Sequence, residues 1–246
     1  MTRINLFADW HTHTRLSDGR GSAEDNVRAA AGRGLQEVAI TDHGPGALFI
    51  GVKSPQIYLD LKEEARRLSW DYSVRVLAGA EANVISQDGA LDIPESVLGQ
   101  LDLVIAGLHF QALAETPGET LGWVVPNNLA RVSRSIRERM RNTNTKALQA
   151  CLHRHRVDIV SHPDLMMAVD VDELARACAG TGAAMEINVG HNYPREPVVL
   201  AALKHGAFLA VNSDAHYPAT VGDLAYGAAL LERFNVPPEQ VKNSLH

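Results

Sequence analysis

The stretch Asp9-Trp10-His11-Thr12-His13 follows a short apolar run, Ile4-Asn5-Leu6-Phe7-Ala8, and determines how the rest of the chain is interpreted. The apolar run predicts a β-strand. Residues i and i+2 of an extended strand point to the same face, so we expect His11 and His13 side by side where this strand ends. Two imidazoles placed in this way can bind one cation. An isolated pair is equally compatible with ordinary polar residues at a strand end.

The pattern along the 246 residues is an alternation of short apolar runs with longer segments of helical period. This alternation is typical of repeated βα units around a parallel sheet. The first strand is expected over residues 4–8, and the others over 37–41, 74–80, 101–108, 157–161, 183–189 and 207–213. No linker, repeat or low-complexity segment separates a second domain, so we predict a single domain over residues 1–246.

Local signals also place the helices. Ser22 is suited to cap a helix, with Asp25 as the acidic partner of a capping box. Further helices are expected over 54–70, from about 129 to 156, and from near Asp170, Pro194 and Ala219. Residues 111–128 contain several Gly and Pro residues, and we expect an irregular loop there, of the kind that covers binding sites.

Composition narrows the class of protein. A formal net charge of −6 argues against binding to duplex nucleic acid, which requires a basic surface. Only Cys151 and Cys178 are present, so neither a disulfide framework nor a thiolate zinc cage is indicated. No apolar run reaches the ~20 residues that span a bilayer, and no secretory signal begins the sequence. We expect a soluble, cytoplasmic protein.

Chemistry-bearing residues gather at the predicted strand exits. Of the 11 histidines, those at exits are His11, His13, His43, His109, His162 and His216, and His191 lies just past another exit. In parallel βα proteins the strand exits converge on one face. Asp18, Glu81 and Asp214 would join them there, which makes more groups than one metal ion can use. Packing so many titratable groups together without a cation would be costly.

The donor types indicate which metals would bind. Imidazole and carboxylate without thiolate suit zinc, manganese or iron. A carboxylate such as Glu81 can bridge two ions ~3.5–4 Å apart.

The chain resembles the PHP (polymerase and histidinol phosphatase) superfamily over nearly its whole length. The motifs that carry the resemblance occur in the same order: His11-x-His13, Ser17-Asp18-Gly19, Thr41-Asp42-His43, Gly79-x-Glu81, His109, His162-Pro163 and Ser213-Asp214-x-His216. Residues 79–83, 88–92 and 237–239 are similar to those of small stand-alone phosphatases and of the PHP domain fused to bacterial family X polymerases. The resemblance implies a distorted seven-stranded (βα)7 barrel and a trinuclear metal site.

The resemblance also implies how about three divalent metal ions would be held. One ion would be bound by His11, His13, Glu81 and Asp214. Glu81 would bridge to a second ion, bound by His109 and His162, and a third would be bound by Asp18, His43 and His216. Some relatives carry histidine where Asp18 stands, and a carboxylate there favours manganese or iron.

These features predict a metal-dependent phosphoesterase that acts on small phosphate monoesters. A metal-bound hydroxide would attack phosphorus while the metals neutralise the equatorial and leaving oxygens. Neither a G-x-S-x-G elbow nor a phosphate-binding P-loop motif occurs. Arg195 is a candidate phosphate-binding residue, because it stands at the start of a helix opened by Pro194. The alternative for Arg195 is a solvated surface arginine.

Other functions remain open from the sequence. A histidinol phosphatase, a phosphodiesterase or a 3′–5′ exonuclease would use the same metal residues. The arginines at 131–141 leave open the binding of a nucleic-acid substrate, although we favour the interpretation that they line a solvated helix face. An amidohydrolase also begins with H-x-H, but usually needs a carbamylated lysine, and no lysine stands at a predicted strand exit. A PHP module that has lost its metals would have a structural or binding role. The sequence does not indicate an oligomeric state.

Overall fold

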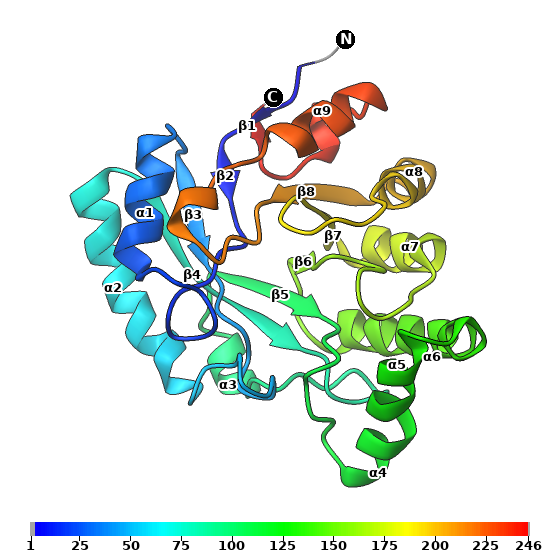
Figure 1. Cartoon of the computed structure of the whole chain (residues 1–246). Helices are drawn as coiled ribbons and strands as arrows, with labels where there is room; N and C mark the ends of the chain where they lie inside the picture. The colour runs from blue at the N-terminus through cyan, green and yellow to red at the C-terminus, as the bar shows by residue number, and fades with distance from the viewer. Residues whose placement is uncertain (1–2, 246) are drawn as a thin grey trace.

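Parallel strands form a single curved sheet at the centre of the computed structural model, which describes residues 3–245. Spatial order follows chain order, and all neighbouring strands are parallel. The seven strands are β2 (Ala8–Asp9), β3 (Glu37–Ile40), β4 (Arg75–Asn83), β5 (Leu103–Gly107), β6 (Ile159–Val160), β7 (Ala184–Asn188) and β8 (Phe208–Asn212). The sheet curls nearly into a barrel with helices around its outside (Figure 1). This confirms the predicted distorted (βα)7 barrel.

Helices connect the strands and cover the outer face of the sheet. They are α1 (Ala23–Gly32), α2 (Gln56–Tyr72), α3 (Glu95–Leu98), α6 (Arg134–Arg154), α7 (Val171–Thr181), α8 (Glu196–His205) and α9 (Ala225–Arg233), with short 3₁₀ turns at Pro218–Thr220 and Pro238–Gln240. Ser22 and Asp25 form the predicted capping box at the start of α1. None of the helices within residues 3–245 is long and apolar enough to cross a membrane.

The barrel interior is packed rather than hollow. Alternate strand residues contribute an inner apolar cluster that includes Ala39, Ile105, Ile159, Ala184 and Ala210, all almost inaccessible to solvent. Small side chains on several strands suit the narrow interior of a barrel of this strand number. The apolar filling lies beneath the strand exits, so it forms a rigid floor for the side chains that follow each strand.

The segment expected to be an irregular loop is helical over much of its length, so that prediction was wrong. It contains α4 (Pro117–Glu119), a π-helical turn over Thr120–Val124 and α5 (Val125–Ala130). Pro117 and Pro126 stand in the first turns of α4 and α5, where a missing N–H costs nothing. Trp123 is 1% exposed and donates from Nε1 to Asn144 of α6 at 2.8 Å, which holds the segment against the body of the protein.

The first predicted strand is split in two. β1 (Asn5–Leu6) leaves the barrel and pairs antiparallel with β9 (Ser244–Leu245), and only β2 joins the main sheet. β2 and β8 are therefore the two edges of the sheet. Across this seam Thr12 and Ala215 form one parallel bridge, and Asn212 accepts a hydrogen bond from the backbone of Trp10 at 3.0 Å. The position of β1 depends on its pairing with β9, near the other end of the chain, and a local sequence pattern cannot reveal such a partner.

Candidate metal centre

The nine side chains predicted to bind metal meet at the carboxyl ends of the strands. Glu81 lies on β4 itself, Asp18 lies in the loop nine residues after β2, and the others follow their strands by two to four residues. Asp18 and His216 are 25% and 28% exposed and face the opening of the site. The remaining seven are buried: His11, His13, His43, Glu81, His109, His162 and Asp214. The structure thus brings together the complete set expected from the sequence.

Glu81 lies at the middle of the cluster. Its Oε2 is 3.3 Å from Nε2 of His11 and 2.8 Å from Nδ1 of His43. Its Oε1 is 3.3 Å from Nε2 of His109 and 3.0 Å from Nε2 of His162. The two carboxylate oxygens therefore face two different sets of imidazoles, which is the arrangement that a bridging ligand requires.

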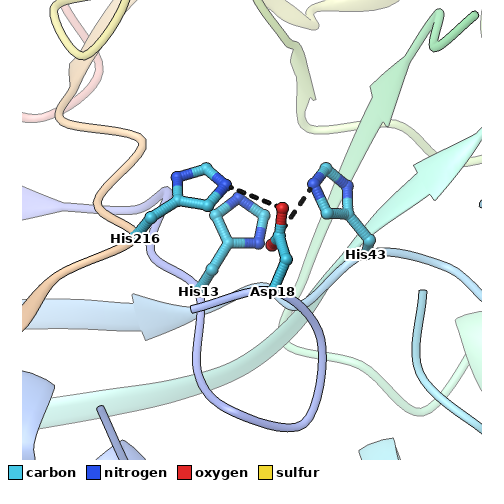
Figure 2. Close-up of side chains that lie close together, drawn as sticks. All are labelled: His13, Asp18, His43 and His216. Carbon is cyan, nitrogen blue, oxygen red and sulfur yellow. Dashed lines mark ion pairs between the residues drawn. The ribbon is translucent and has the colours of Figure 1, made fainter. Parts of the chain in front are cut away.

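Asp214 and Asp18 both lie near the His13 ring. Nε2 of His13 is 3.1 Å from Oδ1 of Asp214. Figure 2 shows the carboxylate of Asp18 beside His13 and between the rings of His216 and His43, with atom separations of 3.2 Å to Nε2 of His216 and 3.8 Å to Nε2 of His43. The imidazoles at this end of the site come from three different strand exits.

Several buried nitrogen and oxygen atoms of the cluster form no hydrogen bond within residues 3–245, and this includes His43 Nδ1 and Glu81 Oε2, whose 2.8 Å contact is an ion-pair contact without hydrogen-bond geometry. They are Nε2 of His11, Nδ1 of His13, Oδ1 of Asp18, Nδ1 of His43 and Oε2 of Glu81. Buried polar atoms in proteins are nearly always paired. Three groups of side chains place their donor atoms within 4.8 Å of one another: His13, Asp18, His43 and His216; His11, His13 and Asp214; His43, Glu81 and His109. The residues present thus fit divalent cations, which would satisfy the unpaired atoms.

The pKa values of two histidines in the cluster are shifted in opposite directions. Burial opposes the charged form of His11, but the carboxylates of Glu186, Asp214 and Glu81 raise its pKa well above the ordinary value. Burial and the neighbouring His43 lower the pKa of His13 to about 4. Strongly shifted pKa values in closely packed groups are common at functional sites and mark this cluster as a candidate site.

Two residues that sequence reasoning missed orient the imidazoles. Glu186, on β7, accepts a hydrogen bond from Nδ1 of His11 at 2.8 Å and another from the backbone N–H of His162 at 2.8 Å. Asn83, at the end of β4, accepts from Nδ1 of His109 at 2.8 Å. The contacts to Nδ1 of His11 and of His109 fix the tautomer and turn Nε2 of each ring toward the centre, which is how ligand histidines are usually supported. The sequence signal was present: Glu186 and Asn188 are polar residues two apart within an apolar strand.

A cavity of about 110 Å³ opens above the cluster. Besides candidate metal-binding residues, its wall contains Ile50, Gln111, Met166 and His191. His191 lies 3.0 Å from Oδ2 of Asp214 and also lines a second, neighbouring cavity of about 300 Å³. His191 thus lies at the boundary between the two cavities.

Arg195 lines the second cavity and is absent from the wall of the first. It is 5% exposed, and its guanidinium lies between the rings of Tyr193 and Tyr226, at 4.8 and 5.0 Å. Nε donates to the carbonyl of Asn188, and Nη1 donates to that of Tyr193 at 3.0 Å. Arg195 is thus not a solvated surface arginine, although part of its hydrogen-bonding capacity is used by the backbone.

The arginines at 131–141 are in part paired with nearby acids. Arg134 contacts Glu138 at 3.2 Å along the exposed face of α6, and Arg137 contacts Asp164 at 3.0 Å. Arg131 lies 4.4 Å from the ring centre of Phe110.

Comparisons with known proteins agree with this picture. The family profile described as the PHP domain matches residues 9–189. A probable phosphatase of Caldanaerobacter subterraneus subsp. tengcongensis is 33% identical over 254 residues, covering 98% of this chain and 89% of the relative. A probable phosphatase of Edwardsiella ictaluri is 30% identical over 246 residues, covering 96% and 89%.

Among solved structures, the histidinol phosphate phosphatase of Lactococcus lactis subsp. lactis Il1403, determined with zinc, L-histidinol and phosphate, is similar with a TM-score of 0.63 and 17% identity over 93% of both chains. At this identity the similarity establishes the fold alone. The profile match covers most of the chain, and the barrel and the order of the site motifs agree with it. This chain therefore belongs to the PHP domain family.

Proposed function

We propose that the protein is a metal-dependent phosphoesterase that hydrolyses small phosphate monoesters at a site for about three divalent metal ions. The observation that carries this proposal is the set of buried, unpaired imidazole and carboxylate atoms that converge at the strand exits of a PHP barrel. The relatives at 33% and 30% identity, both named probable phosphatases, support the reaction class.

The proposed assignment divides the side chains among three positions. His11, His13, Glu81 and Asp214 would hold one ion; His109, His162 and the shared Glu81 would hold a second; Asp18, His43 and His216 would hold the third. The two oxygens of Glu81 face His11 and His109 respectively, which supports its bridging role. Imidazole and carboxylate donors suit zinc, manganese or iron. Cys151 and Cys178 are buried on α6 and α7 and are not part of the set.

Metal ions bound there would make a water molecule acidic enough to attack phosphorus near neutral pH and would neutralise charge on the ester oxygens. The protein side chains do the positioning. Glu186 and Asn83 hold the rings of His11 and His109 in a fixed tautomer. The buried floor of the site removes bulk water, which strengthens the interaction of its charges with a phosphate group.

Arg195 remains our candidate for a phosphate contact beyond the metals. Its guanidinium is buried with no carboxylate within 4.0 Å among residues 3–245, and it lines the cavity that adjoins the site. A buried cation without a paired anion favours an anionic ligand. A phosphate leaving the site, or one bound at its edge, would meet this group.

The reaction is tested by supplying zinc, manganese or iron to the metal-depleted protein and assaying a panel of substrates. We expect hydrolysis of phosphate monoesters, with weaker activity on bis(p-nitrophenyl) phosphate and on single-stranded DNA ends. Diesterase or exonuclease activity that exceeds monoesterase activity would replace the proposal with its alternative. Histidinol phosphate belongs in the same panel, because a preference for it would identify a histidinol phosphatase. A protein that retains no metal and hydrolyses nothing would be a structural PHP module.

A further inference from the structure

The loop over residues 14–20 carries Asp18 to the open end of the candidate metal centre (Figure 2). The carboxylate of Asp18 lies 3.2 Å from Nε2 of His216 and 3.8 Å from Nε2 of His43. These two histidines follow strands β8 and β3, whereas Asp18 comes nine residues after β2. No strand therefore fixes the position of Asp18 directly, and the contacts that hold the loop determine whether its carboxylate reaches the two imidazoles.

Asp42 accepts three hydrogen bonds from this loop, although neither the metal assignment nor the positioning contacts described above use it. Its Oδ1 accepts from the backbone N–H of Thr14 at 2.7 Å and from the hydroxyl of Ser17. Its Oδ2 accepts from the hydroxyl of Thr14 at 2.8 Å. Asp42 is 1% exposed. Hydrogen bonds to a carboxylate are stronger than those between neutral groups, so Asp42 is the main side-chain anchor of the loop.

Asp42 is itself fixed beside His43. Tyr58 of α2 is fully buried, and its hydroxyl lies 3.2 Å from the carbonyl oxygen of Asp42 and 3.0 Å from that of His43. At the other end of the loop, the N–H of Arg20 donates to the carbonyl of His216 at 2.8 Å. The loop is thus attached to the segments that carry both of its neighbouring histidines.

Gly19 keeps the loop compact next to Asp18. Its N–H donates to the carbonyl of Thr14 at 2.9 Å. A Cβ atom on Gly19 would lie 2.5 Å from the carbonyl carbon and oxygen of His13, a distance that side chains in folded proteins do not show. The backbone can approach this closely only at a glycine, so a larger residue at position 19 would displace the loop.

We propose that Asp42 is a positioning residue for the third metal ion, because it holds the 14–20 loop where Asp18 completes the ligand set. This inference rests on the proposed function. It adds that the third ion can be lost separately from the two ions that share Glu81. Ligands must be held close to their productive geometry by the residues behind them, and loss of such a supporting contact typically costs 10–100-fold in metal affinity.

Manganese titration of Asp42→Ala tests this role. We expect its affinity for the third ion to fall about 10–100-fold, so that about two ions remain after dialysis where the wild type keeps about three. Asp42→Asn should recover much of the affinity, because its amide oxygen still accepts from Thr14 and Ser17. Gly19→Ala displaces the same loop by another route and should reproduce the loss. Calorimetry gives the affinities, and elemental analysis gives the number of ions.

The control is Asp170→Ala, which removes the N-cap of α7 on the outside of the barrel. It should lower the melting temperature and leave the number of bound ions unchanged, which separates a general loss of stability from a local effect on the site. Wild-type affinity in folded Asp42→Ala would overturn the inference. Equal weakening of all the ions would also overturn it, since Asp42 would then support the barrel as a whole.

Hydrogen exchange of the metal-free protein decides the inference independently of the number of ions. The amides of residues 14–20 should exchange at least about tenfold faster in Asp42→Ala than in the wild type, and equal rates would overturn the inference. A wild type that binds no more than two ions would contradict the proposed function instead. If Asp42→Ala does not fold, Ser17→Ala removes one of the three hydrogen bonds and should weaken the third ion alone by severalfold. An unchanged affinity in Ser17→Ala would then reject the role of Asp42.

Discussion

His11 donates from Nδ1 to Oε1 of Glu186 at 2.8 Å, and both side chains are completely inaccessible to solvent. The second Glu186 oxygen accepts from the backbone of His162, so one carboxylate supports two residues that follow different strands, β2 and β6. Asn212 adds a further donor to Oε1 at 2.9 Å. Because both oxygens of Glu186 accept hydrogen bonds from buried protein groups, we interpret Glu186 as a residue that supports the site.

Glu186→Gln should therefore weaken metal binding without removing a ligand. The amide can present its NH₂ group to His11 and favour the wrong tautomer, and loss of such a supporting contact typically costs 10–100-fold in metal affinity. Competitive titration with a chelator measures the change. Glu63→Gln is the matched control, because its side chain is 75% exposed on α2. Equal affinities in both variants would show that Glu186 has no such role.

Glu81→Ala and Asp18→Ala should differ in how much metal they lose. Removal of a bridging ligand should release two ions and abolish nearly all activity, whereas removal of Asp18, at the exposed end, should release only one. Elemental analysis after gentle purification gives the stoichiometry of each. If Glu81→Ala keeps the metal content of the wild type, the multinuclear assignment is wrong.

Arg195→Ala should lower kcat/KM by about 10²-fold if the guanidinium binds phosphate, the size expected for losing a charge-assisted contact of roughly 2–3 kcal/mol. Arg195→Lys should recover part of this, because it keeps the charge but not the planar donor pair. Metal content and the melting temperature, recorded for both variants, separate a binding defect from loss of the stacking on Tyr193 and Tyr226. Unchanged kinetics would make Arg195 purely structural.

Hydrolysis should proceed by direct attack of water on phosphorus. The site described within residues 3–245 presents imidazole and carboxylate groups that could hold metal ions, and the sequence contains no G-x-S-x-G nucleophile motif. In ¹⁸O-labelled solvent, a single turnover should place one label in the released phosphate. Mass spectrometry of the products reads this directly. Label in the alcohol, or a trapped phosphoenzyme, would require a different mechanism.

The two thiols should be inert in the folded protein. Burial raises the pKa of Cys151 and of Cys178 to about 12, so almost no thiolate exists at neutral pH. Iodoacetamide should leave both unmodified in native protein and alkylate both in guanidinium chloride, as intact-mass analysis will show. Rapid native modification of either would mean that α6 or α7 opens locally.

The site residues at the strand exits were predictable because a histidine or carboxylate stands at the carboxyl end of each of these apolar runs. Parallel strands bring their carboxyl ends together at one face. His43, His109 and His162 were found from this pattern alone. Glu186 was missed because it lies within a strand, where an acidic residue between Met185 and Ile187 was not treated as part of the site. The same two-residue period that pairs His11 with His13 also pairs Glu186 with Asn188, so the signal was available.

Other features depend on partners distant in sequence. The prolines near residues 117 and 126 indicated a loop, yet each begins a short helix because Trp123 packs against α6 and stabilises the segment from outside. The separation of β1 from β2 depends on β9, more than two hundred residues away. The placement of Arg195 between two tyrosine rings likewise depends on Tyr226 of α9, which local sequence does not bring near.

The candidate metal site spans the seam between the two edge strands of the sheet, β2 and β8. His13 follows one edge and Asp214 follows the other, and their side chains meet at 3.1 Å. A cation bound by both side chains would connect the two edges of the barrel where backbone pairing is reduced to the single Thr12–Ala215 bridge. Metal binding and folding are then linked. When metal is scarce, the barrel would open at this seam more often and be cleaved by proteases more quickly. The supply of metal in the cell would then determine the lifetime of the protein as well as its catalytic rate.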